Sequence, residues 1–329
     1  MEIVVSEFGT FIKKNGNRFE FKSKNVTEEF SADNLNQIIV TCNSVLSTAA
    51  IELAMKNDID IVFVNKFGQP YARIYPCTLG GTTLTRKKQL EATGNIKGAI
   101  LSKKFVEGKV KNQINFLKAL NKSRNDENIK NKIKELENFI LKLDELNGNK
   151  IEEIREQLLG IEGYIASEYF SCLSNIVPIK SRDTTGKDPF NAMLNYGYGI
   201  LYSEIERACI LAGLDPYLGF YHTDRYGKPC MVLDLIEEFR PIIVDRSIVT
   251  LFVQKQVEDK DFQITGDSFL LSESGRRKVI EVVLKRLNTK IKISNSTKSF
   301  QNIILDEARK VVRFLLEENF KYEPFVHRW

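Results

Sequence analysis

The sequence predicts an α+β fold, with a small N-terminal β-rich domain (β-sandwich-like) followed by a larger all-α domain. Short β-prone segments fill the first eighty-odd residues, and apolar residues at i, i+3, i+4 spacing dominate after about Leu84. The length of 329 residues exceeds that of a typical single domain. We therefore expect two domains, 1–85 and 86–329.

The N-terminal domain is expected to contain strands joined by short turns and one helix. Asn15-Gly16 lies between two β-prone segments and is a strong hairpin-turn signal. Good helix formers at 47–57 predict a helix, with Ser47 as its N-cap. The expected strands are 2–8, 9–14, 18–23, 36–42, 59–65 and 69–76.

The C-terminal domain is expected to be helical. A further helix at 272–288 has Ser272 as its expected cap. The polar segment 177–189, "VPIKSRDTTGKDP", contains prolines and a glycine, so we expect a mobile loop there. The other expected helices are 96–122, 127–146, 150–174, 190–212 and 298–319.

Composition narrows the class of protein. The chain is 43% apolar and 28% charged, and no apolar run approaches the ~18–20 residues that span a bilayer. The N-terminus shows no signal-peptide pattern, so we expect a cytoplasmic protein without membrane association. No CxxC pair occurs, which argues against a disulfide framework or a thiolate zinc site. The cysteines are Cys42, Cys77, Cys172, Cys209 and Cys230.

Positive charge is concentrated in one window. Residues 86–111 carry eight basic residues and two acids, so this window is +6 in a chain whose net charge is +5. Such a concentration can attract a polyanion through counterion release. It is equally typical of a solvated helix face, and the sequence leaves both interpretations open.

Glu162 occupies an unusual place in its predicted helix. At roughly 100° per residue it projects within an apolar stripe, with Leu158 and Ile165 as neighbours one turn away. Burying a carboxylate without a partner costs several kcal/mol, so Glu162 requires a cation, a hydrogen-bond network or a metal. An internal salt bridge or a helix edge that reaches solvent would also explain it. Gly160 and Gly163 flank the position and would let a ligand or a helix approach closely.

A second group of polar residues follows one of the two histidines. His222 precedes a turn-like segment, after which come Asp234, Glu237 and Glu238. Asp234 and Glu237 have the spacing of a capping box, which needs no metal. Alternatively, His222, Glu237 and Glu162 could ligate Mg²⁺ or Mn²⁺, with Asp234 orienting a ligand or a metal-bound water. Spacing does not choose between the two.

Two segments resemble the CRISPR-associated integrase of spacer acquisition, the larger of the two core adaptation proteins. They are "LLGIEGYIASEYF", 158–170, and 195–246, which contains "AGLDP", "GFYHTDRYGKP" and "LDLIEEFRP". In that family a Glu, a His and an Asp or Glu bind the catalytic metal. The resemblance places these on Glu162, His222 and Glu237, with Asp234 as a companion. Glu at the third position keeps the oxygen donor.

The resemblance also implies an activity and partners. The activity is metal-dependent DNA strand transfer with endonuclease activity, in which the 3′-hydroxyl of a short fragment attacks a phosphodiester of a CRISPR repeat during antiviral defence. The implied partners are DNA, a second copy of the chain joined through the N-terminal domain, and the small second adaptation protein. Candidate DNA contacts are Arg86, Lys87, Lys88 and Arg240.

Two other functions stay open, namely a general metal-dependent DNA nuclease and a non-catalytic DNA-binding scaffold. The sequence lacks HExxH, GxSxG and P-loop motifs that would favour another enzyme class. His327, in "EPFVHRW", has no chemical role that we can assign from the sequence.

Overall fold

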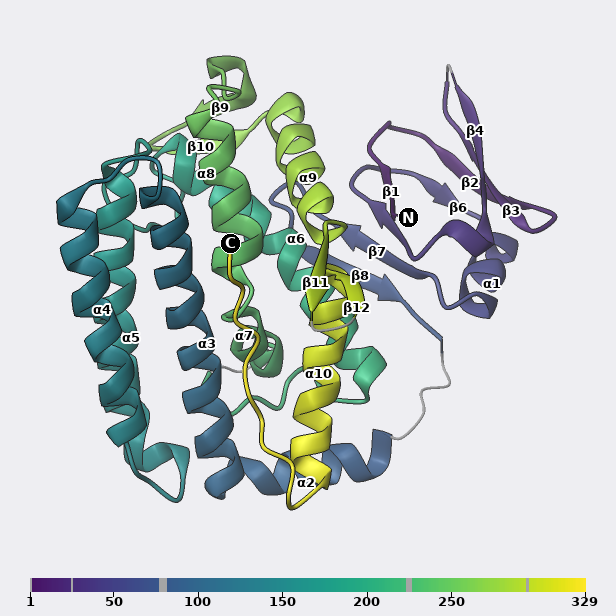
Figure 1. The fold of residues 1–329 in the computed structure, drawn as a ribbon. Coiled ribbons are helices and arrows are strands. Elements are labelled where there is room, and N and C mark those ends of the chain that lie inside the picture. Colours follow the sequence, from purple (N-terminus) through teal and green to yellow (C-terminus); the bar gives the residue numbers. More distant parts are fainter. Residues whose placement is uncertain (1, 25, 77–81, 223–226, 294–295) are drawn as a thin grey trace. The chain divides into compact units, whose positions relative to one another are not determined.

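The computed structural model describes residues 2–24, 26–76, 82–222, 227–293 and 296–329 (Figure 1). The chain forms two compact units, Met1–Gly80 and Gly81–Trp329. The expected α+β fold, with a β-rich part followed by a mostly helical part, is confirmed. Thr223–Tyr226, part of the turn expected after His222, lie outside the described residues, as does Cys77.

The first unit is built from two four-stranded sheets that share one hydrophobic core. In the first sheet β1, β5 and β7 run parallel and β8 is antiparallel to β7. In the second, β2 pairs antiparallel with β3 and parallel with β6, and β3 pairs antiparallel with β4. The strands are β1 (Glu2–Val5), β2 (Phe11–Asn15), β3 (Arg18–Lys22), β4 (Thr27–Ser31), β5 (Gln37–Val40), β6 (Val45–Leu46), β7 (Asp60–Val64) and β8 (Pro70–Ile74).

Local signals in this unit act as the sequence predicts. Gly16 has a φ of 61°, which favours glycine, and closes the β2–β3 hairpin. The Ser47 side chain accepts a hydrogen bond from the Ala50 amide at the start of α1 (Thr48–Lys56). The strand β4 was not expected, because its sequence TEEFS is mostly polar.

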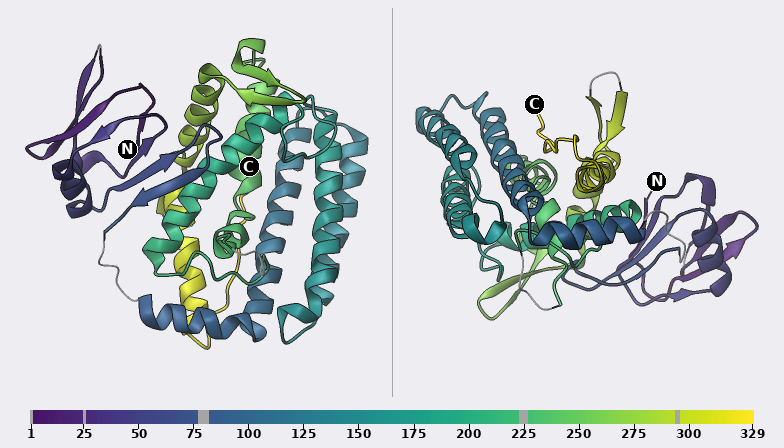
Figure 2. Two further views of the ribbon diagram at one scale, coloured as in Figure 1. Left: turned by 180° about the vertical axis from the view of Figure 1, so that it is seen from behind. Right: turned by 90° about the horizontal axis from the view of Figure 1, so that it is seen from below.

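The second unit is dominated by long helices, and α3, α4 and α5 pack side by side (Figures 1 and 2). Ser272 caps α9 as expected. The helices are α2 (Thr82–Thr93), α3 (Ile96–Asn121), α4 (Glu127–Glu145), α5 (Ile151–Ser174), α6 (Pro189–Ala212), α7 (Cys230–Ile236), α8 (Arg246–Val253), α9 (Glu273–Leu287) and α10 (Phe300–Leu316), together with a π-helical segment η2 (Arg240–Asp245).

The expectation of an all-α second domain is wrong in detail. Two hairpins interrupt the helices, β9 (Phe262–Thr265) with β10 (Ser268–Leu271) and β11 (Lys290–Ile293) with β12 (Ser296–Ser299). Each is too short to give a clear two-residue alternation.

The loop 177–189 is anchored rather than free. The Arg182 guanidinium donates to the Asn191 and Asn195 side chains at 2.9 and 2.6 Å. The Phe269 amide donates to the Gly186 carbonyl at 2.8 Å. The polar residues that suggested mobility therefore bind the start of α6 and the β10 strand.

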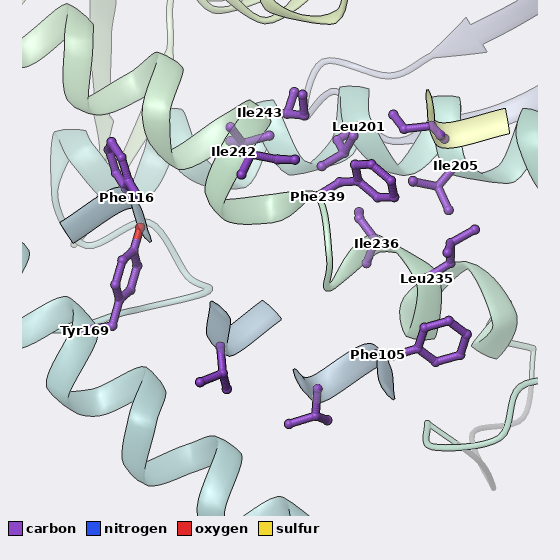
Figure 3. Packing of buried hydrophobic residues seen from close by; sticks show 14 of the residues in the cluster. Phe105, Phe116, Tyr169, Leu201, Ile205, Leu235, Ile236, Phe239, Ile242 and Ile243 are labelled. Atoms are coloured by element: carbon purple, nitrogen blue, oxygen red, sulfur yellow. The ribbon is translucent and has the colours of Figure 1, made fainter. Parts of the chain in front are cut away.

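The core of the second unit surrounds α7 and η2. Figure 3 shows Leu235, Ile236 and Phe239 lying between Phe105 of α3 and Leu201 of α6. Because this segment is enclosed by helices, the positions of its carboxylates are set by packing.

Two further findings concern the whole chain. Among the described residues, Cys42, Cys172, Cys209 and Cys230 are free thiols. The described helices include none with both the length and the apolar character needed to cross a membrane.

Candidate metal centre

Glu162 and Glu237 converge on one lysine. The Lys109 ammonium, from the middle of α3, pairs with Glu162 Oε1 of α5 and lies 2.6 Å from Glu237 Oε2, just after α7. The Lys109 and Glu237 side chains are 10% and 2% exposed, and that of Glu162 is 14% exposed. Glu162 thus has the cation that its place in an apolar stripe requires, and the expected internal salt bridge is present.

Charge at this centre keeps its groups ionised. Burial opposes ionisation of Glu237, but Arg240, Lys109 and His222 together lower the pKa of its carboxyl to about 2. Burial likewise opposes the charge on Lys109, yet Glu237 and Glu162 raise the pKa of its ammonium above the usual value. Glu237 and Lys109 therefore carry full charges at neutral pH.

The π-helical segment brings a second cation to Glu237. Arg240 Nη1 lies 2.7 Å from Glu237 Oε1, three residues earlier, and its guanidinium lies over the Tyr198 ring at 5.0 Å. Glu237 Oε2 is buried and accepts no hydrogen bond of good geometry, so the ammonium of Lys109 contacts it as an ion pair only.

Asp234 fixes His222. It is fully buried within α7, and its carboxylate accepts the backbone amides of Phe220, Tyr221 and His222 at 2.6, 3.0 and 2.8 Å. The same carboxylate lies 2.8 Å from His222 Nδ1. An Nδ1–H donated to a carboxylate leaves Nε2 with a lone pair, the arrangement typical of a metal-bound histidine.

The capping-box interpretation of Asp234 and Glu237 is wrong. The helix α7 begins at Cys230 with Pro229 as its N-cap and has no side-chain cap bond, so Asp234 lies inside the helix. The signal was misread because the N-cap, Pro229, lies five residues before the position that the box would require.

Tyr221 links the two parts of the centre. Its hydroxyl donates to Glu162 Oε2, while its ring packs edge-on against His222 at 4.7 Å between centroids. Burial, with Glu162 beside it, raises the pKa of Tyr221 well above its ordinary value, so this hydroxyl stays a donor.

Glu238 belongs to a different part of the protein. It accepts the Tyr322 hydroxyl and, at 3.0 Å, the Phe325 amide of the C-terminal segment. Burial and the neighbouring Glu307 raise the pKa of Glu238 well above its usual range. The two adjacent carboxylates therefore have different roles. Glu237 belongs to the charged centre, and Glu238 binds the C-terminal segment.

The donors present fit a divalent cation chemically. Two carboxylates share one cation, one of their oxygens lacks a hydrogen bond, and His222, whose Nδ1 faces Asp234, can offer Nε2 to a metal. As they stand, no three or more His, Cys, Asp or Glu side chains in the described part of the chain form a group that could hold a metal ion. In this arrangement the Lys109 ammonium stands between the carboxylates.

The sequence between residues 3 and 285 matches the family model for CRISPR associated protein Cas1. The chain belongs to the Cas1 family. It is similar to CRISPR-associated endonuclease Cas1 1 of Archaeoglobus fulgidus, with 35% identity over 349 residues and all of both chains covered.

Solved structures share the Cas1 fold over nearly the whole chain. A casposase bound to integration product aligns with a TM-score of 0.81 at 24% identity, covering 98% of this chain and 92% of that one. A Cas6-RT-Cas1–Cas2 complex aligns with a TM-score of 0.79 at 18% identity, covering 100% of this chain and 36% of that one. At these identities the likeness shows the fold.

A basic pocket adjoins the centre in this Cas1 family member. It has a volume of about 420 Å³, and Lys109 and Arg240 line it together with Lys180 and Arg182 of the loop 177–189. Asp245 also lines it, but the Tyr169 and Tyr198 hydroxyls donate to its two oxygens at 2.8 and 2.5 Å. Four cations from three different segments therefore meet beside Glu237.

Sequence reasoning missed Lys109, Tyr221 and Asp245. Lys109 was counted with the basic window, yet its neighbours Phe105, Val106 and Val110 are fully buried. A lysine among apolar residues that face the core is the signal that could have identified it. Asp245 follows the apolar run PIIV, a comparable signal.

The other basic residues of the window 86–111 have mixed roles. Lys97 donates to the Phe314 and Leu315 carbonyls at the end of α10, and Lys103 to the Leu146 carbonyl. These contacts satisfy helix C-termini. Of the predicted DNA contacts, Arg86 and Lys87 are exposed on α2, Lys88 pairs with Glu91 at 2.7 Å, and Arg240 alone is at the centre.

Proposed function

We propose that this protein is a divalent-metal-dependent DNA integrase and endonuclease that acts in the cytoplasm and inserts short DNA fragments into a CRISPR array. The observation that carries this proposal is the convergence of Glu162 and Glu237 on one buried cation beside His222. Membership of the Cas1 family and similarity to a relative named as an endonuclease support it. The casposase of the same fold, bound to an integration product, favours strand transfer over simple cutting.

The proposed ligands of Mg²⁺ or Mn²⁺ are Glu162, His222 and Glu237. When bound, such an ion polarises a phosphoryl oxygen and stabilises the leaving oxygen. Asp234 would hold His222 in the tautomer with Nε2 available, and Tyr221 would orient Glu162. Arg240 and Lys109 would direct positive charge at the phosphate, since both reach the adjoining pocket.

The proposed reaction exchanges one phosphodiester for another. The 3′-hydroxyl oxygen of the fragment bonds to phosphorus, and the bond from that phosphorus to the 3′-oxygen of the array strand breaks. The attacking hydroxyl gives up its proton, and the leaving oxygen takes one up from solvent. No external energy source is needed.

The proposed assembly contains a second copy of the chain, joined through the N-terminal unit, and a small second adaptation protein. The Cas6-RT-Cas1–Cas2 complex, whose Cas1 portion shares this fold, supports such an assembly. Arg86, Lys87 and Lys88 remain proposed DNA contacts.

A strand-transfer assay tests the proposal. It would combine Mn²⁺ or Mg²⁺, a duplex with free 3′-hydroxyls, a supercoiled plasmid carrying a CRISPR repeat and the small partner, with wild type, Glu162→Ala, His222→Ala and Glu237→Ala. Lys187→Ala, on an exposed residue outside the pocket, is the control. We expect metal-dependent joining that the three variants lose and the control keeps. Cutting without joining would indicate a general nuclease, and metal-independent binding without chemistry would indicate a scaffold.

A further inference from the structure

A second groove lies on the helical unit away from the metal centre. It has a volume of about 800 Å³, and it lies between α3, α4, the start of α8 and the last two residues of the chain. Its lining shares no residue with the pocket beside Glu237. It therefore requires an explanation of its own.

The groove is strongly basic. Among the described side chains that line it, Glu137 is the only acid. Its carboxylate pairs with Lys118 at 2.6 Å, while Lys130 pairs with Glu127 at 2.6 Å. Within the described part of the chain, the other four cations of the lining form no ion pair. These are Lys122, Lys134, Arg246 and Arg328.

An aromatic ring is held at the edge of this charge. Trp329 is 41% exposed, and its ring packs on Phe116 and His327 at 5.5 and 4.6 Å between centroids. The Phe116 ring, on which Trp329 packs, also has the guanidinium of Arg246 above it, 5.9 Å from the ring centroid. The indole is thus supported by two rings and remains partly exposed to solvent.

The C-terminal segment that carries this ring runs beside α3 (Figure 1) and is attached to it by hydrogen bonds. The Asn115 amide donates to the His327 carbonyl, and the His327 amide donates to Asn112 Oδ1, both at 2.8 Å. Asn112 also donates to the Phe325 carbonyl at 2.8 Å. His327, which had no role from the sequence, is a buried part of this attachment.

Unpaired cations around an exposed, supported aromatic ring are the features that bind single-stranded nucleic acid. Phosphates neutralise the cations and release counterions, while any base can stack on the ring. An acidic peptide would satisfy the cations but would leave the indole face without a partner. A duplex would keep its bases stacked on one another, so the indole would again have no base to stack on.

We propose that this groove binds single-stranded nucleic acid, with phosphates on Lys122, Lys134, Arg246 and Arg328 and a base stacked on Trp329. This goes beyond the proposed function, since it needs neither a metal nor the centre at Glu237. The site would hold an unpaired strand while the chemistry occurs elsewhere on the molecule.

Trp329 is the single tryptophan of the chain, so its fluorescence reports on this groove directly. The experiment titrates the protein with a twelve-nucleotide oligothymidylate in EDTA, which removes divalent metal, and follows tryptophan emission. Fluorescence anisotropy of a labelled oligonucleotide measures binding independently. We expect saturable quenching, and a log-log salt slope of about −3 if four phosphate contacts each contribute about −0.7. Glu162→Ala should quench equally, which separates this site from the metal centre.

Matched variants make the test specific. Lys122→Glu with Lys134→Glu should weaken binding at least ~10-fold, since two contacts become repulsive. Lys290→Glu with Lys292→Glu makes the same charge change on exposed residues of β11 and should have little effect. Trp329→Phe should abolish the emission signal and weaken anisotropy-detected binding several-fold.

Three results would overturn the proposal. They are binding without any change in emission, equal losses for the two double variants, and stronger quenching by a twelve-residue polyglutamate than by the oligonucleotide. Circular dichroism melts of each variant verify that it is folded. Trp329→Phe changes no charge, so it tests the role of the ring separately from the two double variants.

Discussion

The Lys109 ammonium lies 2.6 Å from Glu237 Oε2 and also pairs with Glu162, so one buried cation joins carboxylates from the middle of α5 and the end of α7. Three segments far apart in the sequence meet at this point. A divalent ion at the same carboxylates would compete with the ammonium for the same oxygens. If the proposed metal binds here, we therefore expect Lys109 to weaken its binding to the free protein.

Lys109→Met tests this competition. Removing one partner of a buried ion pair leaves charge uncompensated, and we expect the free energy of unfolding in EDTA to fall by about 3–5 kcal/mol. Without the competing ammonium, Mn²⁺ should bind the DNA-free protein at least ~10-fold more tightly than it binds wild type. Calorimetric titration with Mn²⁺ measures the affinity, and melting with and without Mn²⁺ measures the recovery of stability.

The control for this variant is Lys118→Met, which removes a half-exposed pair with Glu137. Its stability should change by less than about 1 kcal/mol and its Mn²⁺ affinity not at all. Equal Mn²⁺ affinities for Lys109→Met and wild type would show that the ammonium and the ion do not share the carboxylates.

Asp234→Asn tests the support of His222. The carboxylate accepts three backbone amides and faces the imidazole, and an amide group in its place supplies one acceptor oxygen and no charge. We expect a loss of about 1–3 kcal/mol of stability and a 10–100-fold lower Mn²⁺ affinity. Calorimetry and the strand-transfer assay measure these effects.

Glu238→Gln is the matched control, because this carboxyl, four residues after Asp234, faces Tyr322 and Phe325 instead of the centre. Its raised pKa means that a neutral side chain already fits there. Mn²⁺ binding should be unchanged. A similar loss of metal affinity in both variants would mean that Asp234 acts only through the packing of this segment.

Much of the fold follows from local patterns in the sequence, and the centre follows only in part. The helix expected at 96–122 is α3, Ile96–Asn121, because its apolar spacing is regular over seven turns. Glu162 was recognised as anomalous for the same reason. The pairing of Lys109 with Glu162 and Glu237 depends on contacts across 53 and 128 positions of the chain, which no local pattern encodes. The π-helical segment that directs Arg240 at Glu237 has no sequence signature that we could use.

Asp245 predicts a pH dependence of stability. Burial, only partly offset by the Tyr198 and Tyr169 hydroxyls, raises the pKa of its carboxyl to about 6 from an ordinary value of 3.8. The folded state then holds a proton that the unfolded state has lost, so this contribution to stability is complete below pH 3.8 and is lost as pH rises through 6. At about 1.4 kcal/mol for each pKa unit, the loss is about 3 kcal/mol.

Asp245→Asn should remove this dependence, since its side chain is neutral throughout. The stability of wild type relative to the variant, measured by denaturant titration, should fall as the pH rises from 4 to 7. Asp183→Asn should give the opposite sign at lower pH, where the stability of wild type relative to this variant falls as the pH drops from about 4 to 2. The reason is that hydrogen bonds from the Lys187 and Thr185 amides help to hold the pKa of Asp183 at about 2, below its ordinary value of 3.8. If the wild type and Asp245→Asn curves stay parallel between pH 4 and 7, Asp245 is ionised in the folded protein.

Alanine substitutions at Gly160 and Gly163 of α5 distinguish an effect on helix stability from an effect on DNA binding at the helix surface. A Cβ added at either position meets no atom within 4 Å, so alanine should stabilise the helix by up to about 1 kcal/mol at both. Only Gly163 lines the pocket beside Lys109 and Arg240. If a DNA strand approaches α5 there, Gly163→Ala should lower strand transfer several-fold while Gly160→Ala leaves it unchanged. Thermal melts and the joining assay on the two variants measure both effects, and equal joining by the two would place the strand away from α5.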